Sequence, residues 1–421
     1  MKAVVLAAGE GLRLRPFTYT RPKHLIPVGG RPILEHILTA LRDAGLREAL
    51  LVVHHKADMI KDYFGEGEKL GMKIEYIIQP KILGTADAAS MAEDYVADDF
   101  LMIYGDLLIT PNVISMIQGA HERNRSAATV SIVPVEHPER YGVVKVEGSQ
   151  VIDIVEKPSS EAAPDHRVNA GIYIFSTEIF KAIRQTGRSQ RGEREITDSI
   201  RLLIDERKSV TAVEIPGQEW LDIGRPWDLF EANIRILNRI EPKVNGLVED
   251  GTHLIGPVTV AEEARIRSGA YIEGPVLIDE GSDVGPNCYI RPYTTVGKNA
   301  RIGNACEIKN SIIMDGTRIG HLSYIGDSVI GEGCNLGAGT ITANLRFDSM
   351  TIKMSIKGET VNSGRKKLGA LIGDHVKTGI GTLLMPGVQI GCNSWIGPNV
   401  VVYEDVQPDT ILVLRQTLEH R

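Results

Sequence analysis

Small and positively charged residues follow the first hydrophobic run of the chain. Residues 2–8 (KAVVLAA) form that run, and Gly9, Gly11 and Arg13 come directly after it. Glycine lets backbone N–H groups approach a phosphate closely, and an arginine adds a fixed positive charge. Lys23 supplies a second cation a few residues later. This pattern predicts a loop that holds phosphate groups.

Two aspartates end later hydrophobic stretches of the same half of the chain. Asp106 follows the run 100–104, and Asp222 lies in the stretch WLDIG at 220–224. Open α/β sheets bind ligands at the carboxyl ends of their strands. Two carboxylates, completed by water and phosphate oxygens, form a typical Mg²⁺ site. We therefore predict that Asp106 and Asp222 hold Mg²⁺; the alternative for either residue alone is a helix cap.

A histidine leads a second group of polar residues in the other half of the chain. His321 opens the stretch HLSYIGD, and Asn335 opens the stretch NLGAGTITAN that follows. Histidine is the usual general base near neutral pH. Arg291 and Lys309 lie eighteen residues apart. A pair of cations suits a phosphate. The alternative is that His321 is an ordinary structural residue.

The elements that position the first group alternate along residues 1–240. Strand-like runs occur at 2–8, 48–54, 72–78 and 100–104, and helical stretches occur at 58–64, 84–94 and 111–122. Further strands, some of them antiparallel, are expected between residues 127 and 176. This alternation predicts a doubly wound α/β domain.

The second group lies within a regular repeat. Every sixth residue from Leu254 to Met314 is aliphatic, and the residue two places earlier is mostly small. A period of six fits neither a helix nor an alternating strand, but it fits a parallel β-helix of hexapeptide repeats, in which eighteen residues make one coil. Arg291 and Lys309 are then one coil apart. Most residues of the repeat are expected only to bury the faces of the coil.

These patterns give the domain organisation. We expect a nucleotide-binding domain at 1–240, a linker at 241–253, a β-helix at 254–406 and a tail at 407–421. The charged stretch 345–368 interrupts the β-helix once.

Composition narrows the classes of function. The chain has 421 residues and a formal net charge of −7, which argues against general binding to nucleic acid or membranes. Its 4 cysteines show no CxxC spacing, so neither a zinc site nor a disulfide framework is suggested. The short apolar run before Gly9 is too short for a secretory signal, and we expect a cytoplasmic protein.

The first half resembles sugar-1-phosphate nucleotidylyltransferases, whose signature is a GxGxR loop followed by a lysine. The resemblance implies that Arg13 and Lys23 act on the triphosphate and that Asp106 and Asp222 bind Mg²⁺. It assigns to the nucleotide Leu6, Ala8, Gly9, Gly11, Gln79, Gly84 and Thr85. It assigns to the sugar phosphate Gly142, Glu156, Lys157 and Asn169.

The second half resembles the acetyltransferase half of the bifunctional enzymes that acetylate glucosamine-1-phosphate and then uridylylate the product. The shared pattern is H-[LT]-[ST]-Y-x-G-D followed by N-x-G-A-G-T-I-T-x-N. The resemblance makes His321 the general base and implies a left-handed β-helix. It assigns to the sugar phosphate Arg291, Lys309, Tyr324, Asn335, Asn344 and Lys367. It assigns to acetyl-CoA Ala338 and Gly381.

Together these resemblances imply an archaeal-type bifunctional enzyme. It would acetylate glucosamine-1-phosphate with acetyl-CoA and then transfer a uridylyl group from UTP, with Mg²⁺ as cofactor, giving UDP-N-acetylglucosamine and pyrophosphate. The family also implies a homotrimer or a dimer of trimers.

The sequence departs from this pattern in two places. Leu345 and the long segment 346–366 stand where the bacterial family has an aromatic residue and a very short loop, which leaves galactosamine-1-phosphate open as a substrate. Lys367 is then open to another interpretation, as part of a basic loop or a contact for the coenzyme A phosphates. The stretch LRPFT at 14–18 is more like the glucose-1-phosphate thymidylyl/uridylyl branch, which leaves dTTP open as well as UTP.

Two alternatives remain. The first is a glucose-1-phosphate uridylyl/thymidylyltransferase that uses the β-helix only as a trimerisation scaffold. The second is a non-catalytic regulator that resembles the epsilon subunit of the eukaryotic initiation-factor exchange complex. The polar group around His321 argues against the first, and the intact phosphate and metal residues argue against the second.

Overall fold

The computed structural model describes residues 1–158 and 166–419, and its contacts divide the chain into two compact units. Unit 1 comprises Met1–Glu10, Pro22–Leu25 and Pro32–Asp222. Unit 2 comprises Gly11–Arg21, Ile26–Arg31 and Ile223–Arg421. The short segments between residues 11 and 31 thus pack with the unit that contains the β-helix, while the flanking residues pack with the other unit.

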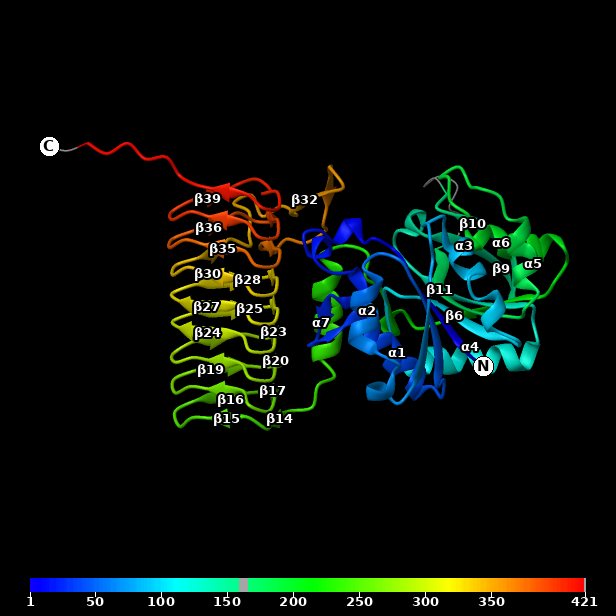
Figure 1. The fold of residues 1–421 in the computed structure, drawn as a ribbon, viewed down its shortest axis with the longest axis horizontal. Coiled ribbons are helices and arrows are strands. Elements are labelled where there is room, and N and C mark those ends of the chain that lie inside the picture. Colours follow the sequence, from blue (N-terminus) through cyan, green and yellow to red (C-terminus); the bar gives the residue numbers. More distant parts are fainter. Residues whose placement is uncertain (159–165, 420–421) are drawn as a thin grey trace. The chain divides into compact units, whose positions relative to one another are not determined.

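Unit 1 is built on a nine-stranded mixed sheet in the order β5-β4-β1-β6-β11-β8-β12-β10-β9 (Figure 1). The strands are β1 (Ala3–Ala7), β4 (Glu48–Val53), β5 (Lys73–Ile78), β6 (Phe100–Tyr104), β8 (Ala128–Pro134), β9 (Gly142–Glu147), β10 (Gln150–Glu156), β11 (Arg167–Phe175) and β12 (Val210–Glu214). Strands β5, β4, β1 and β6 pair in parallel, whereas β11 runs antiparallel to β6. The four parallel strands therefore end at one edge of the sheet.

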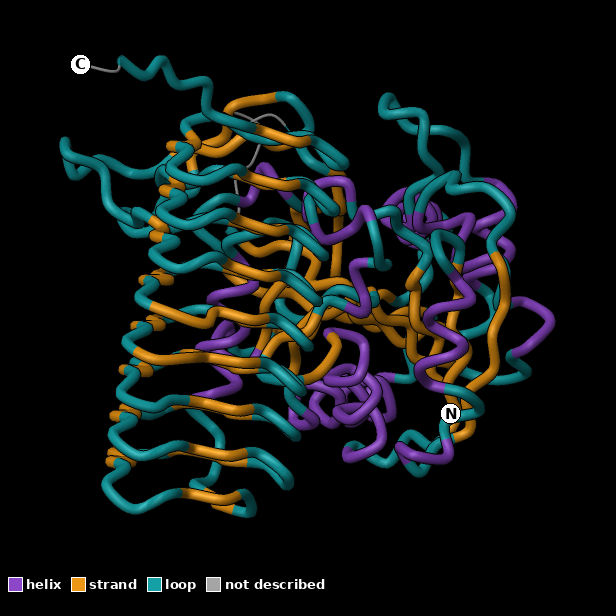
Figure 2. Tube along the Cα trace, turned by 60° about the vertical axis from the view of Figure 1, so that its left-hand side comes forward, coloured by secondary structure: helices purple, strands orange, loops and turns teal. Residues whose placement is uncertain are grey.

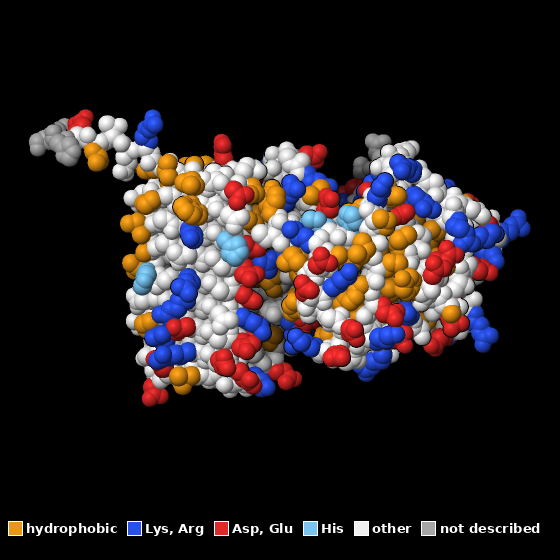
Figure 3. Space-filling view, viewed as in Figure 1, with side chains coloured by type: hydrophobic (Ala, Val, Ile, Leu, Met, Phe, Trp, Pro, Cys, Tyr) orange, Lys and Arg blue, Asp and Glu red, His pale blue; other side chains and the backbone are white. Residues whose placement is uncertain are grey.

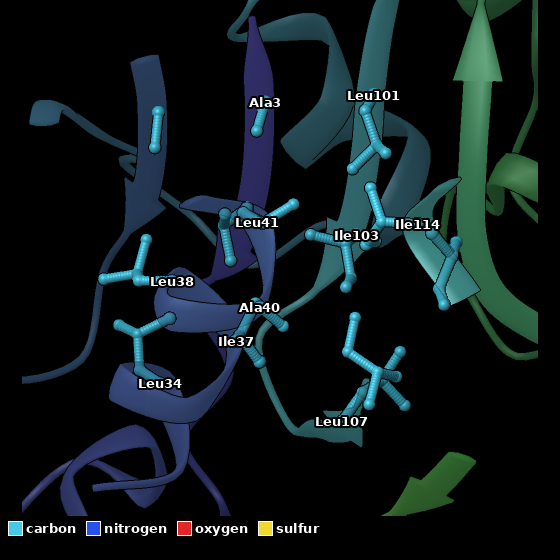
Figure 4. Close-up of a cluster of buried hydrophobic side chains, with 14 of the residues drawn as sticks. Ala3, Leu34, Ile37, Leu38, Ala40, Leu41, Leu101, Ile103, Leu107 and Ile114 are labelled. Atoms are coloured by element: carbon cyan, nitrogen blue, oxygen red, sulfur yellow. The ribbon is translucent and has the colours of Figure 1, made fainter. Parts of the chain in front are cut away.

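Helices cover both faces of this sheet, as the alternating pattern predicts. They are α1 (Ile33–Asp43), α2 (Ala57–Phe64), α3 (Thr85–Ser90), α4 (Pro111–Asn124), α5 (Ile179–Gln185) and α6 (Ile196–Asp205). Successive residues of a strand point to opposite faces. Ala3 and Val5 accordingly pack with α1, α2 and α4, whereas Val4 packs with α3, α5 and α6. Figure 4 shows part of the first cluster, where Leu41 of α1 lies beside β1 and β6.

A short antiparallel ribbon extends from the end of β6. It consists of β7 (Leu107–Ile109) and β13 (Trp220–Asp222). Asp222 lies opposite Leu107, the residue that follows Asp106. The register of this ribbon therefore brings the two predicted metal ligands to the same end.

The β-helix of unit 2 stacks short parallel strands into three faces, which Figure 2 shows as successive coils. Face 1 contains β14 (Lys243–Val244), β17 (Val258–Val260), β20 (Val276–Ile278), β23 (Thr294–Val296), β26 (Ile312–Ile313), β29 (Val329–Ile330), β34 (Leu371–Ile372) and β37 (Gln389–Ile390). Face 2 contains β15 (Leu247–Val248), β18 (Arg265–Ile266), β21 (Asp283–Val284), β24 (Arg301–Asn304), β27 (Arg318–His321), β30 (Asn335–Leu336), β35 (Lys377–Thr378), β38 (Trp395–Ile396) and β40 (Ile411–Leu412). Face 3 contains β16 (His253–Ile255), β19 (Tyr271–Glu273), β22 (Tyr289–Ile290), β25 (Glu307–Lys309), β28 (Tyr324–Gly326), β31 (Ile341–Thr342), β36 (Leu383–Leu384) and β39 (Val401–Val402).

The aliphatic residue of each repeat points into the coil, as predicted, but the predicted position is wrong at Met314. Ile290 pairs with Ile308, a full eighteen residues later. Val296, however, pairs with Ile313, only seventeen residues later. One step of the repeat therefore has five residues. Met314 is buried, yet Ile313 takes the place on the inner ladder.

The coils extend beyond both predicted limits and contain the expected interruption. Strands β14 and β15 lie within 241–253, and β40 lies within 407–421, where it pairs with β38. Asn335 pairs with Lys377, forty-two residues later, because the inserted segment leaves the coil. That segment folds into the antiparallel hairpin β32 (Lys353–Ile356) and β33 (Glu359–Asn362).

Helix α7 (Asp228–Leu237) and the segment 11–21 are fastened to the β-helix within unit 2. The buried amide of Asn233 accepts hydrogen bonds from Gly29 N at 2.9 Å and Thr295 Oγ1 at 2.8 Å. Arg21 forms ion pairs with Asp374 at 2.6 Å and with Glu332 at 2.8 Å. In the part of the chain that the structure describes, no helix combines the length and the apolar character needed to cross a bilayer.

Candidate active sites

The first predicted site begins where β1 and β6 end. Gly105 N donates to Leu6 O at 2.9 Å, which holds the two strand ends together. Lys23 Nζ forms an ion pair with Asp106 Oδ2, and both side chains are mostly buried. A Cβ on Gly9 would come within 3.5 Å of the Lys23 side chain. The structure thus gathers a glycine, a cation and a carboxylate of the predicted site at one strand edge.

The donor set at this edge fits Mg²⁺. Asp106 and Asp222 lie at the same end of the β7–β13 ribbon, and both offer the oxygen donors that Mg²⁺ prefers. Among residues 1–158 and 166–419, no group of three or more His, Cys, Asp and Glu side chains forms a complete metal site. Water and phosphate oxygens would therefore supply the remaining ligands, as they do in nucleotide-dependent enzymes.

The residues predicted to bind the nucleotide base surround the start of α3. The amide nitrogen of buried Gln79 donates to Asp87 Oδ2 at 2.7 Å, and this fixes the orientation of the side chain. Gly84 has φ of 120°, and a Cβ there would lie 2.3 Å from Arg194 O. Thr85 Oγ1 accepts from Ile196 N at 2.9 Å. A glycine is therefore required at position 84, because the backbone of Arg194 packs against it. The hydroxyl of Thr85 binds the backbone of Ile196.

The predicted sugar-phosphate residues come together on β9, β10 and β11. Gly142 lies opposite Glu156 across the β9–β10 pair, and a Cβ on Gly142 would lie 3.0 Å from Glu156 Oε2 and 3.6 Å from Asn169. Lys157 Nζ lies 3.8 Å from Glu156 Oε1. The absence of a side chain at Gly142 leaves room beside one carboxylate, one amide and one cation.

Two further charged residues, Arg191 and Glu195, lie beside this group, and sequence reasoning missed them. Arg191 lies 2.9 Å from Glu195 and 3.7 Å from Glu156. Burial, with a further contribution from the charge of Glu156, raises the pKa of Glu195 to about 7 despite the Arg191 contact. Burial also raises the pKa of Glu156. The alternating charges of residues 191–195 just before an amphipathic helix were the signal that could have identified them.

The loop residues Gly11 and Arg13 belong to unit 2. Gly11 has φ of 67°, and its carbonyl accepts hydrogen bonds from Leu14 N at 2.8 Å and Thr18 Oγ1 at 3.0 Å. The side chain of Arg13 is exposed. The loop is therefore ordered by its own hydrogen bonds and by the Arg21 anchor.

In the β-helix, four predicted residues gather where the strands of face 3 end. Lys309 Nζ donates to Asp327 Oδ2 at 2.9 Å, and Asn344 Nδ2 donates to the same oxygen at 2.6 Å. Asn344 Nδ2 also lies 3.1 Å from the Tyr324 hydroxyl. The register of β22 and β25 stacks Arg291 over Lys309. We call this group the Asp327 corner; Asp327 itself, which is buried, was missed as a site residue.

The remaining residue near this corner is Lys367. Asn344 O accepts from Leu368 N at 3.0 Å, and Leu345 bridges to Lys367. The inserted segment therefore leaves the coil after Asn344 and returns beside it. Lys367 is exposed at this point.

His321 lies at a different corner, where face 2 ends and face 3 has not yet begun. Its carbonyl accepts from Gly339 N at 3.2 Å, and Ala338 O accepts from Gly381 N at 2.8 Å on the next coil. The predicted acetyl-CoA residues therefore stack beyond the histidine, and we call this group the His321 corner. Asn335 lies on β30, level with Arg318 of β27.

Within one chain, His321 and the Asp327 corner occupy opposite ends of the face 3 strands. His321 precedes β28, whereas Lys309 is level with Gly326 at the end of β28. Among the described residues, no hydrogen bond joins the imidazole of His321 to Lys309 or Asn335.

Comparison with known families covers both halves of the chain. A family model described as Nucleotidyl transferase matches residues 2–239, and a model described as GMPPB C-terminal domain matches residues 272–368. The first match alone spans more than half of the chain.

Relatives match along its whole length. A protein named Bifunctional protein GlmU from Methanococcus maripaludis is 47% identical over 99% of this chain and 98% of its own length. Another of that name from Methanocaldococcus jannaschii is 43% identical over 100% of this chain and 99% of its own. A bifunctional sugar-1-phosphate nucleotidylyltransferase/acetyltransferase from Sulfurisphaera tokodaii is 41% identical over 96% of this chain and 98% of its own length. This chain belongs to their family.

Solved structures match the first half of this bifunctional enzyme. A Bacillus anthracis protein described as a glucose-1-phosphate thymidylyltransferase has a TM-score of 0.52 and 30% identity, covering 58% of this chain and 98% of its own. A UDP-glucose pyrophosphorylase in complex with UDP-glucose has a TM-score of 0.51 and 25% identity, and the match covers 55% of this chain and 96% of its own. The chain is a sugar-1-phosphate nucleotidyltransferase and an acetyltransferase, acting on sugar phosphates, a nucleotide and an acetyl donor. The scaffold-only and regulatory alternatives are set aside.

Proposed function

We propose that this enzyme acetylates glucosamine-1-phosphate with acetyl-CoA and then transfers a uridylyl group from UTP to the N-acetylated product. The observation that carries the proposal is the Asp327 corner, where Lys309, Asn344 and Tyr324 converge around one buried carboxylate. A coil that served only as a scaffold has no need of this group.

In the acetyl transfer, His321 acts as the general base. The amine nitrogen of the sugar attacks the thioester carbonyl, and the imidazole takes the proton that the nitrogen loses. The carbon–sulfur bond then breaks, and the coenzyme A thiolate leaves and takes up a proton. Arg291 and Lys309 hold the sugar phosphate, because they are stacked on neighbouring coils and both can donate charge-assisted hydrogen bonds to it. Asn344 and Asp327 orient the sugar.

The acetyl site requires more than one copy of the chain. His321 and the Asp327 corner lie at opposite ends of face 3, so one substrate reaches both when a neighbouring β-helix supplies the second corner. The last coils expose Trp395, Tyr403 and Ile411, with 51%, 74% and 65% of their surface accessible, and Figure 3 shows apolar side chains on this end of the coil. Exposed apolar side chains of this kind mark a surface that another copy of the chain can bury, and that burial stabilises an oligomer. We therefore propose a homotrimer.

In the uridylyl transfer, an oxygen of the sugar phosphate attacks the α-phosphorus in line and pyrophosphate leaves. Asp106 and Asp222 would hold Mg²⁺, which offsets negative charge on the triphosphate. Lys23 stabilises charge on the α-phosphate, and Gly11 and Arg13 hold the triphosphate. Lys157 and Arg191 hold the sugar phosphate. Glu156 accepts hydrogen bonds from the sugar hydroxyls, and Asn169 donates to them. The oxygen of Gln79 accepts from the uracil N3–H.

One assay tests this proposal. Purified protein is given acetyl-CoA with glucosamine-1-phosphate or galactosamine-1-phosphate, and thiol release is measured; UTP or dTTP is then added, and pyrophosphate release is measured. We expect thiol release with glucosamine-1-phosphate and pyrophosphate release with UTP. Release of pyrophosphate without any thiol release from either amino sugar would contradict the acetyltransferase assignment.

A further inference from the structure

A cavity of about 440 Å³ lies within unit 2. Its walls are the loop 12–19, the turn of the β32–β33 hairpin and the last coils of the β-helix. Its volume is in the range of small-molecule sites. None of the residues assigned above to acetyl-CoA or to the amino sugar lines it.

Three cations line this cavity: Arg13, Arg15 and Lys357. None of them forms an ion pair with a residue that the structure describes, although ion pairs are frequent elsewhere in the chain. One carboxylate, Asp405, also lines the cavity, but it accepts hydrogen bonds from Gln389 N at 2.8 Å and Nε2 at 3.2 Å. Three cations against one carboxylate leave the lining with a net positive charge, in a protein whose net charge is −7.

Arg15 and Lys357 each have a defined local setting. The Arg15 guanidinium lies 4.6 Å from the centre of the Tyr19 ring, a cation–π contact that orients it. Lys357 has φ of 53° and Gly358 has φ of 82°, so both central residues of the hairpin turn are left-handed, as a two-residue hairpin requires. A lysine is unfavourable there compared with Asn, Asp or Gly. Its place in the lining of the cavity gives this choice a reason.

The walls are joined to one another by direct contacts. Gln389 Nε2 donates to Ser355 O at 2.6 Å, which ties the hairpin to the last coils. Cys392 Sγ donates to Pro16 O at 3.3 Å, and Asp374 binds both Thr20 and Arg21, which ties the loop to the same coils. The cavity is thus a formed feature of unit 2.

We propose that this cavity binds a diphosphate group, either free pyrophosphate or the diphosphate of a nucleotide sugar. Two linked phosphates match several unpaired cations, and the apolar lining formed by Leu12, Pro16 and Val406 suits an attached ring. Arg13 is also the residue to which we assign the triphosphate. When a diphosphate in the cavity binds Arg13, that side chain is no longer available to UTP, and uridylyl transfer is slower. This second step rests on the proposed function, whereas the binding does not.

Binding is measured by calorimetry in the Lys23→Ala background, which weakens the catalytic nucleotide site. The probes are inorganic pyrophosphate and UDP-N-acetylglucosamine. We expect one equivalent of at least one probe to bind, and Lys357→Glu or Arg15→Gln to weaken it about tenfold, the effect of losing one charge-assisted contact. The matched control is Lys353→Glu, which makes the same charge change on the same hairpin outside the cavity lining. No binding by either probe, or equal losses in the Lys353 and Lys357 variants, overturns the site.

The two probes identify the source of the diphosphate. Tighter binding of UDP-N-acetylglucosamine assigns the site to the nucleotide sugar, and equal or tighter binding of pyrophosphate assigns it to free pyrophosphate. With intact Lys23, the expected result is that UDP-N-acetylglucosamine inhibits uridylyl transfer less in the Lys357→Glu variant than in the Lys353→Glu variant. Equal inhibition of both overturns the regulatory step, and binding without any uridylyl transfer shows instead that the proposed function has failed.

Discussion

Lys309 and Asp327 form an ion pair of 2.9 Å at the end of two adjacent face 3 strands, and the carboxylate is almost fully buried. A second donor, Asn344, binds the same carboxylate oxygen. A buried carboxylate needs hydrogen-bonding partners close to it. Asp327 therefore holds the side chains of Lys309 and Asn344 in position. Asp327 thereby organises the residues to which we assign the amino sugar phosphate.

Asp327→Asn tests that positioning role. The amide keeps the shape but loses the charge, so we expect the KM for the amino sugar phosphate to rise about tenfold or more while kcat changes less. The unpaired Lys309 lowers the free energy of unfolding by roughly 1–3 kcal/mol. Initial rates at varied sugar phosphate provide the measurement. A large fall in kcat at constant KM would speak against positioning.

His321→Ala removes the proposed general base. Acetyl transfer should fall by about 10²–10⁴, the usual contribution of a general base, while uridylyl transfer stays near its original rate. His253→Ala is the control, because His253 is an exposed histidine on the first complete coil. Thiol release and pyrophosphate release are followed separately. Equal loss of both activities would show that the two sites are not separate.

Asp222→Asn tests the metal site. Loss of one of two carboxylates should weaken pyrophosphate release and raise the Mg²⁺ concentration needed for half-maximal rate, because Mg²⁺ loses a charged oxygen ligand. The measurement is the rate of pyrophosphate release over a series of Mg²⁺ concentrations. An unchanged rate and metal requirement would remove Asp222 from the site.

Glu195 predicts a pH dependence of stability. Its pKa is about 7 in the folded protein, above the ordinary value of 4.5, so the folded state binds more protons than the unfolded state between these values. The free energy of unfolding should therefore fall as pH rises from about 5 to 8, by roughly 1–3 kcal/mol for this group. Glu195→Gln removes that contribution. Denaturant titrations at several pH values should show a flatter profile for the variant, and parallel profiles would refute the assignment.

Asp374 predicts a link between the β-helix and the nucleotide loop. This nearly buried carboxylate binds Arg21 and Thr20, at the end of the segment that carries Gly11 and Arg13. Asp374→Asn should loosen that segment and raise the KM for UTP several-fold, with little change in acetyl transfer. Lys353→Glu, on the inserted hairpin, serves as a surface control. If the KM for UTP is unchanged in Asp374→Asn, the anchor has no part in nucleotide binding.

The repeat and the strand-end residues were predictable because they follow simple geometric periods. A spacing of six residues places an aliphatic side chain on every face, and the coil has no other way to bury it. Asp106 was predictable in the same way, because it directly follows a buried strand, and the β7–β13 register brings Asp222 to the same end of that ribbon.

Other features depend on contacts that no local pattern encodes. The step from Ile308 to Ile313 is short because one corner lacks a residue, and a strict period of six therefore misplaces Met314. The packing of residues 11–21 with the coils depends on Arg21 meeting Asp374, more than three hundred residues later. Arg191 contacts both Glu156 and Glu195 from the segment before α6, where only the alternating charges of residues 191–195 marked it.

Two single variants mixed in one tube test the central claim, that one chain carries two separate sites in sequence. His321→Ala and Asp222→Asn are each given glucosamine-1-phosphate, acetyl-CoA, UTP and Mg²⁺, alone and as a mixture, and UDP-N-acetylglucosamine is measured by mass spectrometry. The account predicts little product from either variant alone and restored product from the mixture, since the acetylated intermediate diffuses from one variant to the other. A mixture as inactive as the separate variants would contradict it.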